Sequence, residues 1–70
     1  MYRFKLTKEE KKKLLDGRTI ISIARKLKCS PQYLTSIMTG YRVCGRAMAY
    51  CICKTIDSEL EVEDLFERTK

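Results

Sequence analysis

Apolar residues recur at helical spacing in the segment that begins at Thr19. The positions with the spacing of one buried helical face are Ile20, Ile23, Ala24 and Leu27. Thr19 precedes them and can accept a hydrogen bond from a backbone N–H of the first turn, as helix N-caps do. The pattern predicts a short helix from Thr19 to about residue 27.

A second apolar face follows after a tight turn, with Leu34 and Ile37 as its best core candidates. Ser30 is a good N-cap, and Pro31 at the first helical position needs no intrahelical N–H partner. Gly40 ends the helix. The two segments together predict a helix-turn-helix over residues 19–40, in which the second helix can lie in the major groove of DNA.

The chain before this unit predicts a short extended segment and one helix. Apolar and basic residues alternate from Met1 to Leu6, the period-2 pattern of a strand or arm. Such a strand can pack its aromatic side chains on the helices, pair with a copy of itself, or serve as a basic arm on DNA. Thr7 and Glu10 have the spacing of a capping box, which starts a helix that runs to about Leu15.

The chain after the helix-turn-helix predicts a fourth helix from Arg46 to about Ile56, whose buried face the pattern leaves ambiguous. A short, acidic fifth helix follows a loop, with Val62, Leu65 and Phe66 on its apolar side. We therefore expect an all-α fold, a compact five-helix unit with a short extended N-terminal segment. Residues 1–70 are too few for a second domain.

The charge of the chain is distributed unevenly. The formal net charge is +6, which favours an anionic partner but also keeps a small protein soluble. Residues 1–28 carry ten Lys or Arg against three Asp or Glu, residues 29–55 carry three against none, and residues 56–70 carry two against six. Because an acidic end repels phosphates, we expect it to face away from any DNA or to lie against another protein.

The chain has four cysteines, at positions 29, 44, 51 and 53. No apolar run is long enough to span a bilayer, and the N-terminus lacks the apolar stretch of a secretory signal, so we expect a cytoplasmic protein without membrane contact. Its cysteines should stay reduced there and act as small core residues. Zinc binding is the alternative, but the spacing has no Cys-x-x-Cys pair and the chain has no His.

Nothing in the chain favours catalysis or a cofactor. It has no His and no Gly-rich phosphate loop, and its carboxylates cluster near the C-terminus without a plausible partner nucleophile or base. We predict a protein that is not an enzyme and holds neither a cofactor nor a metal.

Nearly the whole chain resembles the Cro and repressor-type helix-turn-helix domains of temperate phages and bacteria, the lambda-repressor-like fold. The residues in register with that pattern are Thr19, Ile20, Ile23, Ala24, Leu27, Cys29, Ser30, Leu34, Ile37 and Gly40. The family commonly has glycine in the turn between the helices. Here Lys28 stands at that position, which requires a left-handed or adjusted backbone at a modest cost.

The resemblance implies a sequence-specific transcriptional regulator that acts in a lysis-lysogeny switch, in the cytoplasm of a bacterial host cell. Residues 30–39 would enter the major groove, where Gln32 can form a bidentate pair with adenine. The candidates for base contact are Pro31, Gln32, Tyr33, Thr35 and Ser36. The candidates for phosphate contact are Thr19, Tyr41, Arg42 and Arg46. A solvated helix face is the alternative interpretation for Thr35 and Ser36.

A protein-binding role is the other hypothesis. The same fold can act as an antirepressor that binds a partner repressor protein and alters its DNA binding. The candidate partner surface consists of Ile20, Ile21, Tyr33 and Met38, since exposed apolar side chains mark contacts, although packing on neighbouring helices would also account for Ile21 and Met38. A weak homodimer would suit a two-fold operator, with the N-terminal strand or Leu65 and Phe66 as contacts.

Overall fold

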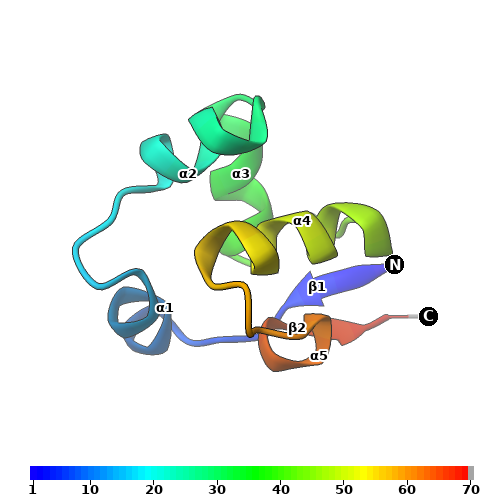
Figure 1. Ribbon diagram of the computed structural model, residues 1–70. Helices are drawn as coiled ribbons and strands as arrows, with labels where there is room; N and C mark the ends of the chain where they lie inside the picture. Colours follow the sequence, from blue (N-terminus) through cyan, green and yellow to red (C-terminus); the bar gives the residue numbers. More distant parts are fainter. Residues whose placement is uncertain (70) are drawn as a thin grey trace.

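Five consecutive helices lie between two short strands in residues 1–69, the part of the chain that the computed structural model describes (Figure 1). Five helices lie within these residues: α1 (Lys8–Leu15), α2 (Ile20–Leu27), α3 (Pro31–Met38), α4 (Arg46–Ile56) and α5 (Val62–Leu65). The strands are β1 (Tyr2–Phe4) and β2 (Phe66–Arg68). The two short helices joined by a tight turn, the fourth helix and the N-terminal extended segment that the sequence predicts are present.

Local side-chain caps start the first three helices as predicted. The N–H of Glu10 donates to Thr7 Oγ1 (3.2 Å), and the Glu10 carboxylate accepts from the Thr7 N–H (3.0 Å). The bond from the Thr7 N–H stabilises the charged carboxylate and is the main cause that lowers the pKa of Glu10. Thr19 Oγ1 accepts from the Ser22 N–H (3.1 Å) in α2. In α3, Ser30 Oγ accepts from the N–H three residues later, with Pro at the start of the helix.

The fold is mostly helical, with the five helices expected, but it is not strictly all-α, because segments near the two ends of the chain form a two-stranded antiparallel sheet. Tyr2 lies opposite Arg68 and Phe4 opposite Phe66. On its other edge β1 pairs with Cys44, whose N–H and C=O both bond to Tyr2. The N-terminal strand thus finds its partner strand in its own chain.

Phe66 explains why the predicted fifth helix is shorter than expected. The helix ends at Leu65, and the extended backbone of Phe66 (φ −127°, ψ 152°) begins β2 instead of continuing the apolar side of α5. The ring of Phe66 meets that of Phe4 edge to face, with centroids 5.5 Å apart, and both residues are buried. Burial of two aromatic rings in a favoured geometry outweighs one further helical turn.

One apolar core joins the helices to the sheet. In Figure 1, α4 runs across the middle of the molecule, with α2 and α3 on one side of it and β1, β2 and α5 on the other. The face of α4 that the sequence left ambiguous is now clear, since Ala49, Ile52, Cys53 and Ile56 are buried. Leu34 and Ile37 of α3 are fully buried, as predicted.

The four cysteines differ in burial. Cys44 and Cys53 belong to the core and Cys29 is half-buried, but Cys51 is exposed, so its assignment as a core residue is wrong. All four thiols are free. Burial raises the pKa of Cys44 and raises that of Cys53 to about 11, because an apolar environment disfavours the thiolate. Both buried thiols therefore keep their protons at neutral pH.

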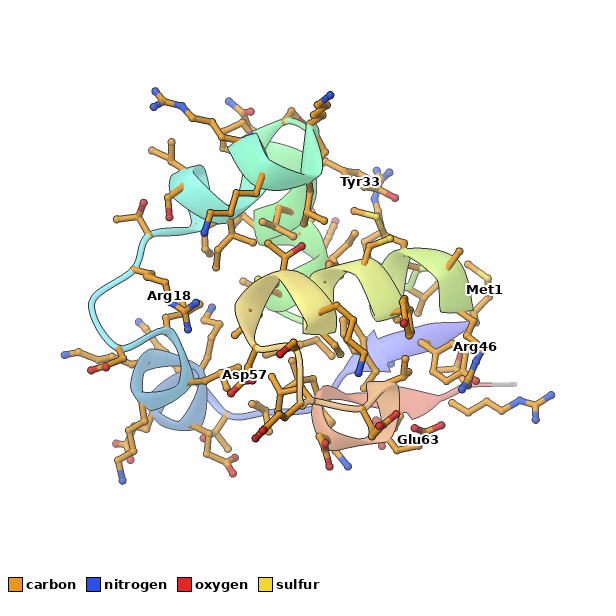
Figure 2. The ribbon with its side chains drawn as sticks, viewed as in Figure 1. Met1, Arg18, Tyr33, Arg46, Asp57 and Glu63 are labelled. Atoms are coloured by element: carbon orange, nitrogen blue, oxygen red, sulfur yellow. The ribbon has the colours of Figure 1, made fainter. Side chains whose placement is uncertain are left out.

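Arg18 connects two helix ends, a role that local sequence patterns do not indicate. Its Nε donates to the Leu15 carbonyl (3.1 Å) at the end of α1, and its Nη1 donates to the Ile56 carbonyl (2.7 Å) at the end of α4. Figure 2 shows the labelled side chain reaching from the loop after α1 toward α4. Carbonyls at helix C-termini lack intrahelical donors, so a guanidinium satisfies two helices at once.

Replacing this arginine should loosen the attachment of α1 to α4. We expect Arg18→Ala to lower the free energy of unfolding by about 1–2 kcal/mol, because hydrogen bonds from a charged donor are lost. Denaturant unfolding followed by circular dichroism measures the change. Arg25→Ala is the matched control, since Arg25 is exposed on α2, and it should change stability by less than about 0.5 kcal/mol. Equal stability of Arg18→Ala and the parent protein would contradict this role.

Lys28 stands at the turn between α2 and α3 in a left-handed conformation (φ 59°, ψ 40°). Its N–H bonds to the Arg25 carbonyl (3.2 Å), and the next N–H, of Cys29, bonds to the Ala24 carbonyl (3.0 Å). This arrangement closes the end of α2 and directs the chain into α3. The adjusted backbone that the sequence predicted for Lys28 is confirmed.

Glycine at this turn should stabilise the protein. A left-handed residue other than glycine costs about 1–2 kcal/mol, which Lys28→Gly removes. Since glycine also gains about 0.4–1 kcal/mol of entropy in the unfolded chain, we expect a net gain of stability of roughly 0.5–1 kcal/mol. Thermal and denaturant unfolding test this. The control Lys26→Gly, inside α2, should lose about 1 kcal/mol, and a similar loss for Lys28→Gly would refute the proposed strain.

Candidate nucleic-acid interface

The buried side of α3 determines which of its residues face outward. Leu34, Ile37 and Met38 are buried in the core. On the other side lie four polar residues, each of which is three or four positions away from two others, so they share one face of the helix. This polar face of α3 consists of Gln32, Thr35, Ser36 and Thr39.

Side chains on this face differ in how free they are to bind a ligand. Ser36 Oγ donates to the Gln32 carbonyl (2.9 Å), and Thr39 Oγ1 donates to the Ser36 carbonyl (3.2 Å). Their hydroxyl protons are therefore already used within the helix. Gln32 and Thr35 are exposed, and their side chains make no hydrogen bond to any other of residues 1–69. Gln32 thus presents both an amide donor and a carbonyl acceptor to solvent.

Tyr33 and Arg42 form a pair beside the polar face. The guanidinium carbon of Arg42 lies 5.6 Å from the centre of the Tyr33 ring, within the range of a cation–π contact. The Arg42 N–H also donates to the Ser36 carbonyl (3.0 Å), so the loop after α3 folds back onto this helix. In Figure 2, Tyr33 points outward from the end of the molecule that holds α2 and α3. The contact places a positive charge at the edge of the polar face.

The other candidate contacts at this end of the molecule are exposed. Thr19 lies at the start of α2, where its hydroxyl accepts one hydrogen bond and can still donate one to a phosphate. Tyr41 is 87% exposed, next to Arg42 in the loop after α3. Pro31 is half-buried at the start of α3. The structure thus brings Thr19, Pro31 and Tyr41 to the outside of the helix-turn-helix.

Arg46 has other partners. Its Nη1 donates to the Tyr2 hydroxyl (2.7 Å) and lies 3.4 Å from Glu63 Oε1. The hydrogen bond to Tyr2 and the nearby Glu63 carboxylate both raise the pKa of Arg46. Figure 2 shows Arg46 beside the labelled N-terminal residue Met1, between β1 and α5. The structure therefore connects this guanidinium to the sheet and to an acidic helix, and does not group it with Arg42.

The apolar residues proposed as a partner surface separate into exposed and buried ones. Ile21 is 53% exposed on α2, and Ile20 is half-buried and packs on the core. Tyr33 is half-buried under Arg42. Met38 is only 1% exposed, so its assignment to a partner surface is wrong. Its side chain fills the core because it lies on the same side of α3 as Leu34.

The segment that holds α2, α3 and α4 has basic side chains and no acidic ones. Residues 17–56 contain no Asp or Glu, and the exposed basic residues at the end of α2 are Arg25, Lys26 and Lys28. Thr39 also belongs to the polar face, although it was not among the predicted base contacts. Its four-residue spacing from Thr35 was the signal for that placement. An acid-free surface with a polar helix at its centre is chemically suited to a polyanion.

Residues 1–69 contain no group of three His, Cys, Asp or Glu side chains arranged to hold a metal ion. Within the same residues, no helix combines the length and the apolar character needed to cross a bilayer.

Comparisons of the chain with protein-family models, with curated proteins and with solved structures give no match. The geometry described above is therefore the basis on which a function can be proposed.

Proposed function

We propose that the protein is a sequence-specific DNA-binding transcriptional regulator that inserts α3 into the major groove. The observation that carries the proposal is the polar face of α3, led by an unpartnered Gln32, on a helix whose opposite side is buried. The absence of acidic residues from positions 17–56 supports it, since nothing there repels phosphates. The role in a phage lysis-lysogeny switch, and the bacterial cytoplasm as its location, are proposed from the resemblance of the sequence alone.

In this mechanism α3 contacts the bases, and the start of α2 and the loop after α3 contact the phosphates. Gln32 pairs with an adenine edge through its amide and carbonyl, and the free hydroxyl of Thr35 accepts from or donates to a neighbouring base. Ser36 can only accept, because its proton is bonded to the Gln32 carbonyl. Phosphates are held by the guanidinium of Arg42, by the Tyr41 hydroxyl and by Thr19 at the start of α2. The contact with the Tyr33 ring favours a position of the Arg42 guanidinium beside the polar face of α3. Arg46 contributes only if it leaves Tyr2 and Glu63.

The proposal is tested by selecting binding sequences from a random pool of duplex DNA at near-physiological salt. The parent protein should enrich a defined motif. Gln32→Ala should relax one base position, with a loss of discrimination of about 1–3 kcal/mol there. Ser58→Ala, which removes an exposed hydroxyl in the loop after α4, is the control and should enrich the original motif. Binding that shows no motif and disappears with added salt would reject sequence-specific recognition.

Arg42 should contribute affinity without sequence preference. We expect Arg42→Ala to weaken binding to all duplexes alike and to reduce the slope of log affinity against log salt by about 0.9, the value for one lost phosphate contact on duplex DNA. Affinity measured at several salt concentrations provides both results. Arg68→Ala, on the exposed strand β2 away from α3 (Figure 1), removes the same charge and should leave the slope unchanged. A base-specific loss for Arg42→Ala would contradict this assignment.

The second candidate function is an antirepressor that covers a partner repressor protein. The exposed side chain of Ile21 favours it, because a DNA-binding helix has little use for an apolar residue there. In that case the protein should release a repressor from its operator, and Ile21→Glu should abolish the release. Ile21→Val is the conservative control. If the purified protein instead enriches a DNA motif that Ile21→Glu leaves unchanged, Ile21 is not part of the functional surface.

A further inference from the structure

A partly open cavity lies between the start of α1 and the end of α3, and Thr39 is the one residue that it shares with the polar face described above. Its volume is about 330 Å³, and the residues that line it are Leu6, Lys8, Lys11, Met38 and Thr39. The volume lies near the lower end of the range of about 300–1,000 Å³ that is typical of small-molecule sites. The cavity is thus large enough for one small organic molecule.

The lining combines an apolar floor with two positive charges. Leu6 is half-buried and supplies apolar contact area, while the buried Met38 closes the bottom of the cavity. Lys8 and Lys11 are three residues apart on α1 and therefore point to the same side of this helix. Lys11 is half-buried and lines the cavity, and lysines in such positions pack their methylene groups on apolar surface while the ammonium group stays in water.

These two lysines have no acidic partner among residues 1–69. The ion pairs within the described part of the chain are Arg46 with Glu63 and Lys54 with Glu61. The Thr39 hydroxyl donates to a backbone carbonyl of α3, so it offers an acceptor and not a free proton. The ammonium groups of Lys8 and Lys11 are therefore the donors available to a molecule in the cavity.

We propose that this cavity binds a small organic anion with a compact apolar body, such as an aromatic carboxylate. An inorganic phosphate would satisfy the lysines but leave the half-buried Leu6 side chain in contact with water. A neutral apolar molecule would cover the floor but gain nothing from the two ammonium groups. A carboxylate attached to a flat apolar group makes both kinds of contact at once. The site is independent of the proposed DNA recognition.

Methionine methyl resonances provide a direct test with 2-naphthoate as the probe. The chain has three methionines, of which only Met38 lines the cavity, so Met1 and Met48 are internal references. We expect saturable shifts of the Met38 methyl signal on titration with 2-naphthoate. The neutral 2-naphthamide, which has nearly the same shape, should bind at least tenfold more weakly. This comparison uses the unmodified protein and does not depend on the folding of a variant.

Matched variants on α1 separate a specific site from general attraction to a basic protein. The double variant Lys8→Gln, Lys11→Gln should weaken 2-naphthoate binding about tenfold, as expected for the loss of charge-assisted contacts. Lys12→Gln with Lys13→Gln removes the same charge from positions outside the cavity and should leave the affinity within twofold. Equal losses in both double variants, equal affinity for the amide, or no saturable shift of Met38 would each overturn the proposal. Loss of DNA affinity in the first variant without any naphthoate binding would instead assign these lysines to phosphate contact.

Discussion

The packing of the apolar side of α3 against the core is the constraint on which the candidate site depends. Leu34, Ile37 and Met38 are buried together, so rotation of α3 about its axis would expose apolar surface and is strongly opposed. Because the helix cannot rotate, the outward direction of Gln32 and Thr35 is fixed before any ligand binds. A polar face held in this way loses little conformational freedom on binding, which favours affinity and specificity.

Contacts between distant parts of the chain hold that core closed. The sheet joins residues near both ends of the chain. The rings of Phe4 and Phe66 pack against one another and attach the sheet to the core. Arg18 fixes the ends of α1 and α4 to one another from the opposite end of the domain. For so small a domain, each such contact is a substantial part of the total stability, since a short chain buries a modest fraction of its surface.

The features that the sequence predicted correctly are local in sequence. Thr7, Thr19 and Ser30 cap helices by bonding to N–H groups three residues later, and such bonds can be recognised from spacing alone. The features it missed are not local. Phe66 becomes part of a strand because of Phe4, and Arg18 binds a carbonyl 38 residues away. No periodicity within a short window contains that information.

The same distinction applies to the candidate site. Helical periodicity correctly separated Leu34 and Ile37 from Gln32 and Thr35, because one side of a helix is either buried or not. The same periodicity puts Met38 on the side of Leu34, four residues earlier, so its packing in the core agrees with the pattern, whereas its assignment to a partner surface does not. Periodicity could not show that Arg46 bonds to Tyr2 and Glu63, since these partners come from β1 and α5. Predicting the accessibility of a single side chain required the full set of its neighbours.

The central claim is that Gln32 on α3 contacts the bases of a specific DNA sequence. Gln32 is the only residue of the chain with a side-chain carboxamide, so the side-chain amide pair in a ¹⁵N–¹H correlation spectrum reports on this residue alone. We would record that pair during titration with the duplex that the protein enriches and with a shuffled duplex of equal composition. A large shift with the enriched duplex and a small one with the shuffled duplex is the predicted result. An amide pair that stays at its free position while the enriched duplex saturates the protein would contradict the account.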